Sequence, residues 1–265
     1  LLEKLMIPLL AKLANLVPQG GIWMNTQRPE WNDANNALAG NGLSVVTMAY
    51  CYQYTSFLQE WFGRLPTSSV YSLTEEVANW MRQQYQVLSN APALLNDSER
   101  YEFLKAMSKI ADAYRKSLYT ESFSGRREEL KLNEIQSFLL SANEWLANGL
   151  EANRRSDELF QSYNLLKRTG EDRISIDHLE EMLEGQVAIL SSGYLSPEES
   201  LRLLNTLRSS RLYRADQASY ILYPDRTLTA FLDKNRIAES DIQRFKLASR
   251  LADHPELGII ERDNR

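Results

Sequence analysis

The chain has 265 residues, of which 25% are charged and 43% are hydrophobic, and this is the composition of an ordinary globular protein. The formal net charge is −5, and the basic residues are dispersed along the sequence. A nucleic-acid groove depends on clustered lysine and arginine, so the composition argues against nucleic acid as a partner.

Helical periodicity dominates from the first residues. The first predicted helix covers residues 1–16 and ends before the glycine pair 20–21. Residues 17–42 then form a long loop, in which residues 21–24 read as a short strand. A loop of this length inside a compact domain is usually functional or disordered, and its two tryptophans favour a functional loop.

The second predicted helix covers residues 43–62. It lies in a 26-residue segment, 34–59, that contains no Asp, Glu, Lys or Arg. Apolar residues occur on all of its faces, which is typical of a helix enclosed by others. The asparagines and glutamines in and beside it would make a membrane span costly, and the chain has no other candidate span. We therefore expect no membrane partner.

The rest of the chain also reads as helices. A capping box at residues 72–75 opens a third helix that ends near residue 89. Further helices are predicted from residue 97 or 98, over 128–150 and 177–190, from residue 196, and over 228–234 and 240–251. These elements predict an all-α fold, a helical (α/α) barrel or part of one, in a single domain over 1–265. Because the chain begins inside an amphipathic pattern, we expect a segment of a longer polypeptide, with the remainder as its partner.

Several kinds of chemistry have no support in the sequence. It contains no glycine-rich phosphate loop and no GxSxG, HExxH or paired CxxC motif. Cys51 is the single cysteine, and His178 and His254 are the only histidines, which argues against a Cys/His mechanism. We interpret His178 as part of a helix start and expect neither metal nor cofactor. The lone cysteine favours a reducing compartment, so the predicted location is cytoplasmic.

The most informative segment covers residues 28–36, directly before the uncharged helix. It contains two carboxylates, three amide side chains and a tryptophan. A flat apolar ring, planar amides and carboxyl groups are the means by which proteins hold sugars and transfer protons to them. Burial beside Trp31 would raise the pKa of Asp33, as a general acid near neutral pH requires. The alternative is an irregular surface loop whose Asx residues form turns.

This segment resembles a known family. Trp31-Asn32-Asp33, then Asn36, Gly40, Gly42 and Ser44-Val45, is similar to the Gly-Asp-Trp-Asn-Asp-Gly-Met-Asn segment of the cellobiose phosphorylase family. The resemblance covers about 20 residues and implies an (α/α)6-barrel glycoside hydrolase or phosphorylase. It also implies that Asp33 is the general acid that protonates the departing sugar oxygen.

The sequence departs from that family at Pro29-Glu30, where the family has Gly-Asp, and at Ala34, where it has Gly. The family's phosphate-binding residues are not found, so phosphorolysis is not implied. An inverting hydrolase also needs a base. Candidates for this base are Glu181, Glu184, Asp216 and Asp225. Glu30 is too close in sequence to Asp33 to be the base, and we expect it to bind sugar or to tune the acid.

Two further patches combine polar and aromatic residues. One joins Asn153-Arg154-Arg155 with Tyr163-Asn164, and the other covers residues 211–226. Both also fit ordinary connecting loops, the second one held by ion pairs. The predicted substrate-binding residues are Arg28, Glu30, Trp31, Asn32, Asn35, Asn36, Tyr163, Arg214, Tyr223 and Arg226.

The sequence therefore predicts a carbohydrate-active enzyme that breaks or transfers a glycosidic bond in an oligosaccharide or glycoside, with Asp33 as general acid. The rival hypothesis is a non-catalytic helical domain that binds another protein, in which Trp23 and Trp31 are packing anchors. A sugar site predicts a concave pocket, whereas an interaction domain predicts a flat or grooved apolar face.

Overall fold

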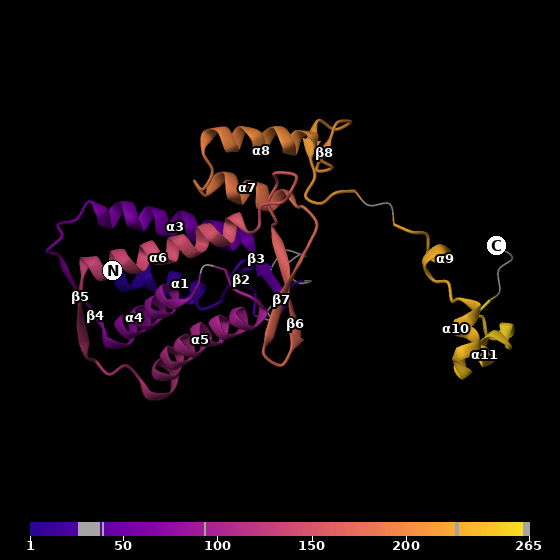
Figure 1. Ribbon diagram of the computed structural model, residues 1–265, viewed down its shortest axis with the longest axis horizontal. Helices are drawn as coiled ribbons and strands as arrows, with labels where there is room; N and C mark the ends of the chain where they lie inside the picture. The colour runs from indigo at the N-terminus through magenta and orange to yellow at the C-terminus, as the bar shows by residue number, and fades with distance from the viewer. Residues whose placement is uncertain (26–37, 39, 93, 226–227, 262–265) are drawn as a thin grey trace. The chain divides into compact units, whose positions relative to one another are not determined.

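A computed structural model describes residues 1–25, 38, 40–92, 94–225 and 228–261. The chain divides into two compact units, Leu1–Pro224 and Asp225–Arg265. The first unit contains most of the helices and all the strands of the described residues, and Figure 1 shows their arrangement.

Two long helices form the centre of the first unit. Helix α3 (Val45–Gly63) packs along α6 (Leu132–Glu151), and α6 packs in turn against α4 (Glu75–Asn90). The closeness of α3 and α6 depends on Gly149, where a Cβ atom would lie 2.7 Å from Sδ of Met48. Helices α1 (Leu2–Leu13) and α5 (Asp97–Lys116) pack on α4 (Figure 1).

A five-stranded antiparallel sheet adjoins this helical layer, in the order β1-β2-β3-β6-β7. The strands are β1 (Leu16–Val17), β2 (Gly21–Trp23), β3 (Gly42–Ser44), β6 (Tyr163–Gly170) and β7 (Arg173–His178). The predictions of an all-α fold and of a helical (α/α) barrel are therefore wrong. Three of the five strands have only two or three residues, which is too short for a period-2 pattern to be visible in the sequence.

The buried guanidinium of Arg100 attaches α5 to the sheet. It donates to the backbone oxygens of Pro18, Leu95 and Ile174 and pairs with Asp97 at 2.8 Å. Because a buried charge is costly unless its hydrogen bonds are made, this set of partners fixes the helix on the strands.

A second, two-stranded sheet displaces two predicted helix starts. Strand β4 (Val70–Thr74) pairs with β5 (Arg127–Lys131). The predicted helix over 128–150 therefore begins only at Leu132. The predicted capping box at 72–75 is also wrong, because Thr74, the residue before α4, makes no side-chain cap hydrogen bond.

The predicted helix over 177–190 begins late for a similar reason. His178 is the last residue of β7, and α7 covers Leu183–Ser191.

Other predicted boundaries are confirmed. The short strand at 21–24 is β2, and α8 (Pro197–Ser209) begins with a complete capping box between Ser196 and Glu199. A short hairpin, β8 (Tyr213–Arg214) and β9 (Ser219–Tyr220), follows α8.

The second unit consists of short helices: α9 (Phe231–Lys234), α10 (Glu239–Arg244), α11 (Lys246–Ala252) and a 3-10 turn at Pro255–Leu257. The helix predicted over 228–234 begins only at Phe231, and the helix predicted over 240–251 is divided into α10 and α11 at Phe245. Within the described residues, none of the helices combines the length and the apolar character that crossing a membrane requires.

Helix α3 is less enclosed than predicted. Its buried side includes Met48, Leu58 and Phe62, whereas Phe57 and Trp61 are exposed on the side turned away from the core. The uncharged sequence therefore reflects one buried face and one exposed aromatic face.

Two glycine substitutions test how α7 is held. A Cβ atom at Gly185 would lie 2.3 Å from Oγ of Ser162, and the Gly185 N–H donates to that same oxygen at 2.8 Å. We expect Gly185→Ala to lower the free energy of unfolding by about 2 kcal/mol, because the helix must move away from residues 161–162.

Gly63, the last residue of α3, is the matched control, since nothing described lies within 4 Å of a Cβ atom there. Gly63→Ala should leave the free energy of unfolding unchanged or raise it by up to about 1 kcal/mol. Urea denaturation measures both values, and equal effects of the two substitutions would contradict this packing.

Candidate functional site

Two buried asparagines join three parts of the first unit. Nδ2 of Asn153 donates to the backbone oxygens of Gln19 and Gly149, at 3.0 and 2.8 Å. Nδ2 of Asn164, on β6, donates to the oxygen of Gly20 at 2.7 Å and to Oδ1 of Asn153 at 2.7 Å. These bonds connect the end of α6, the turn before β2 and strand β6 of the sheet.

The two amides fix the proton position on His178. Because Asn164 must present its NH2 group to two oxygens, its Oδ1 atom is the end that faces Nδ1 of His178, at 2.8 Å. Nδ1 therefore donates the proton to Oδ1. In the neutral ring, Nε2 is then a hydrogen-bond acceptor that remains available to a ligand.

His178 lines a cavity of about 290 Å³ beside the C-terminal end of α6. The other lining residues are Ala152, Asn153, Arg154, Arg155, Ser156 and Gln161. The cavity is close to the lower limit of small-molecule sites, and its lining is mainly amide, imidazole and guanidinium groups.

Gln161 is the least satisfied side chain of this cavity. Its residue is only 7% exposed, and Oε1 is buried without a hydrogen-bond partner among the described residues. Most buried polar atoms have a partner, so an unpartnered buried amide in a cavity wall indicates a place where a ligand or water binds.

The two arginines of the cavity are neutralised by carboxylates. Arg154 lies within 3.7 Å of Glu151, Glu158 and Glu199. Arg155 pairs with Asp157 at 2.9 Å and with Glu181 at 3.3 Å. The cavity therefore offers hydrogen-bond donors without a net positive charge, and this favours an uncharged polar ligand over phosphate or another anion.

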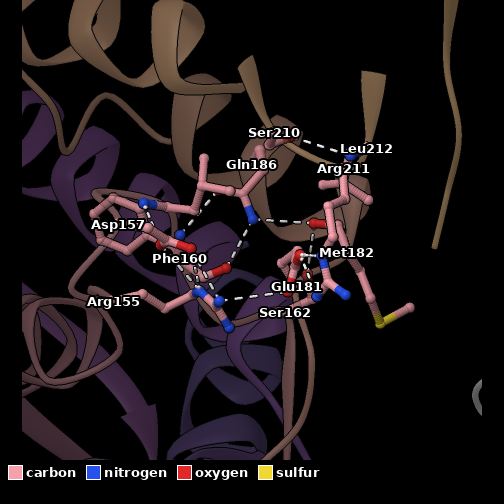
Figure 2. A network of polar contacts seen from close by, with 11 residues as sticks. Arg155, Asp157, Phe160, Ser162, Glu181, Met182, Gln186, Ser210, Arg211 and Leu212 are labelled. Atoms are coloured by element: carbon pink, nitrogen blue, oxygen red, sulfur yellow. Dashed lines mark hydrogen bonds and ion pairs between the residues drawn. The ribbon is translucent and has the colours of Figure 1, made fainter. Parts of the chain in front are cut away.

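Figure 2 shows how Arg155 connects the cavity to a buried carboxylate. Glu181 is buried between Arg155 and Arg211, and Oε1 accepts from Nη2 of Arg211 at 2.8 Å. Nearby, Gln186 of α7 receives the Phe160 N–H and donates to the Phe160 oxygen (Figure 2). This network fixes the segment 155–162 against α7 and the loop at 210–212.

A second carboxylate, Glu184 of α7, lies beside a buried phenol. Burial, together with the neighbouring carboxylate of Glu184, raises the pKa of Tyr163 well above its usual value, with smaller contributions from Tyr223 and Tyr50. Oε2 of Glu184 is buried, and it has no partner within the described part of the chain. Glu184 is thus a carboxylate in contact with tyrosine and not committed to an arginine.

The predicted site residues fall into two groups. Asp33 and seven predicted substrate-binding residues lie outside the described residues: Arg28, Glu30, Trp31, Asn32, Asn35, Asn36 and Arg226. Of the three that are described, Tyr163 is buried beside Glu184, Arg214 pairs with Asp216 at 2.9 Å, and Tyr223 is exposed. The structure brings Tyr163 and Tyr223 near each other.

The predicted patch of Asn153-Arg154-Arg155 with Tyr163-Asn164 does come together, through the bond between the two asparagines. Sequence reasoning missed His178 and Gln161 in this site. Asn164 lies opposite His178 in the pairing of β6 with β7, and that register is the signal that joins them. Among the described residues, no group of three or more His, Cys, Asp and Glu side chains is placed to hold a metal ion.

Comparison with known protein families and with curated protein sequences finds no match for this chain.

The charge network gives a stability prediction. Glu181→Gln removes the charge that faces Arg155 and Arg211. We expect the free energy of unfolding to fall by roughly 2–3 kcal/mol, because the pair with Arg155 loses its buried anion. The loss is not larger because Arg211 is partly exposed and water can solvate its charge. Asp216→Asn, in the exposed pair with Arg214, should leave the free energy of unfolding almost unchanged. Thermal denaturation measures the stability of both variants. Similar losses of stability would show that the buried ion pair contributes no more than the exposed one.

Proposed function

We propose that this protein is a carbohydrate-active enzyme that breaks or transfers a glycosidic bond, with Asp33 as general acid and the cavity at His178 as a binding site for a sugar unit. The segment around Asp33 supports the chemistry. The cavity supports the ligand class, because its groups are those that exchange hydrogen bonds with hydroxyls. The cytoplasmic location expected from the lone Cys51 is part of the same proposal.

The observation on which this proposal depends most is the electrical balance of the cavity. Five carboxylates surround Arg154 and Arg155: Glu151, Glu158 and Glu199 near the first, and Asp157 and Glu181 near the second. A sugar hydroxyl can donate to Nε2 of His178 or to Oε1 of Gln161 and accept from a guanidinium. A phosphate group has no proton for the first two and finds no excess positive charge.

Of the candidate bases Glu181, Glu184 and Asp216, the described contacts favour Glu184. Glu181 is held by two arginines, and Asp216 by Arg214. Glu184 keeps an unpartnered buried oxygen among the described residues, beside Tyr163, and a base needs such an oxygen to accept a proton from water.

Binding of neutral and phosphorylated sugars tests the ligand class. We expect titration calorimetry on the full chain to show binding of a neutral mono- or disaccharide. The affinity for its phosphate ester should be at least about tenfold lower, because the arginines are already neutralised. His178→Ala should weaken binding of the neutral sugar by about tenfold, as expected for the loss of one hydrogen bond to the ligand. His254→Ala, in the second unit, is the matched control and should bind normally. Preference for the phosphate ester would contradict the proposal.

The chemical role of Asp33 has its own test. A general acid contributes about 10²–10⁴-fold, so Asp33→Asn in the full-length polypeptide should lower turnover of unactivated glycosides by that order. Aryl glycosides with acidic leaving groups need little protonation and should lose much less. Equal losses on the two substrate classes would remove Asp33 from the role of general acid.

A second candidate function has one observation in its favour. Tyr50, Phe57 and Trp61 are exposed along α3, and an exposed aromatic face is typical of a surface that contacts another polypeptide. If the full-length polypeptide turns over no glycoside and the cavity binds no neutral sugar, this non-catalytic function is the better account.

A further inference from the structure

A second cavity lies away from the site at His178, between α4, α5 and the π-helical turn Ser117–Glu121 that extends α5. It encloses about 450 Å³, within the range of small-molecule sites. One face of α4 forms its floor with Glu75, Glu76, Asn79, Trp80 and Gln83, and Tyr114 of α5 lies opposite.

Trp80 has an unused hydrogen-bond donor in this cavity wall. The residue is only 5% exposed, and its ring stacks on Tyr114 with centroids 4.3 Å apart. Nε1 has no partner within the described residues. Because an indole N–H can only donate, a buried one without a partner indicates a missing acceptor oxygen.

Glu76 has an unused acceptor one turn before Trp80. Its Oε1 atom receives the Ser124 N–H at 2.7 Å, whereas its buried Oε2 atom is unpartnered among the residues that the structure describes. The hydrogen bond from the Ser124 backbone is the main reason that the pKa of Glu76 lies below its usual value, so this carboxylate is charged at neutral pH.

The lining of the cavity is negative overall. Glu75, Glu76 and Glu121 face a single lining cation, Arg126, and Arg126 is committed to Glu75 at 2.7 Å. Glu121 lies 3.5 Å from Lys116. Of these three carboxylates, Glu76 is the one with a buried oxygen that makes no hydrogen bond within the described residues, although the charge of Arg126 acts on this carboxylate through space. A ligand ammonium would supply the missing contact.

We propose that this cavity binds a small protonated amine that also carries hydroxyl groups, of the size and kind of an amino sugar. The ammonium group donates to Oε2 of Glu76, and a neighbouring hydroxyl oxygen accepts from Nε1 of Trp80. Tyr114 adds an apolar aromatic surface to the cavity wall.

A neutral sugar would leave the negative charge of the lining in excess over its one described cation, Arg126, and a simple alkylamine would leave Trp80 without an acceptor. The combination of the two groups therefore selects the ligand class. This inference does not depend on the proposed glycosidic chemistry, because the two cavities have no lining residue in common.

The test uses the full chain, D-glucosamine as the probe and D-glucose as its neutral counterpart. The indole N–H resonances of the tryptophans are followed by NMR, with Trp80→Phe used to assign the Trp80 signal. We expect glucosamine to shift this signal and to bind at least about tenfold more tightly than glucose, since a charge-assisted hydrogen bond is about twice as strong as a neutral one.

Glu76→Gln keeps the acceptor for the Ser124 N–H but removes the charge. This substitution should weaken the binding of glucosamine by about tenfold or more. Glu102→Gln is the matched control, because Glu102 is an exposed glutamate of α5 outside the cavity. Trp80→Phe, which keeps a ring but loses the donor, should weaken binding measured by calorimetry. An unmoved Trp80 signal, equal binding of glucose, or wild-type binding by Glu76→Gln would each overturn the proposal.

Discussion

The bond between Asn153 and Asn164 is the constraint on which the candidate site depends. Both residues are almost fully buried, and each makes every hydrogen bond that its NH2 group can make. A buried polar network that is fully satisfied specifies one arrangement, because any other leaves donors unpaired at low dielectric. The end of α6, the turn at 19–20 and β6 are therefore held in one geometry, and His178 takes its orientation from it.

The charges around the cavity follow from the same geometry. Once Asn153 is fixed at the end of α6, the next two residues, Arg154 and Arg155, extend towards carboxylates from three directions: Glu151 on the same helix, Glu199 on α8 and Glu181 before α7. Each arginine thereby ties a separate element to the end of α6, and its charge is neutralised. The result is a rigid polar wall that suits hydroxyl groups better than anions.

Much of the helical part of this fold could be predicted from periodicity and capping residues, as at Ser196 and at the start of α5. Of the sheet only β2 could be predicted, because β1 and β3 are two or three residues long and are defined by long-range pairing. For the same reason the sequence identified Asn153 and Asn164 as a polar patch but assigned His178 to a helix start. Only the register of β6 with β7 places His178 opposite Asn164. The segment around Asp33 lies outside the described residues, so its predicted role stays a prediction.

The tautomer of the neutral His178 ring tests the central claim most directly, because it shows whether the two asparagines orient the ring that lines the cavity. Nitrogen-15 NMR of the imidazole ring distinguishes the two neutral tautomers without any added ligand. The account predicts that neutral His178 carries its proton on Nδ1, hydrogen-bonded to Oδ1 of Asn164, and leaves Nε2 as an acceptor. A neutral ring protonated on Nε2 would contradict it, since Nδ1 would then face the asparagine oxygen without a proton.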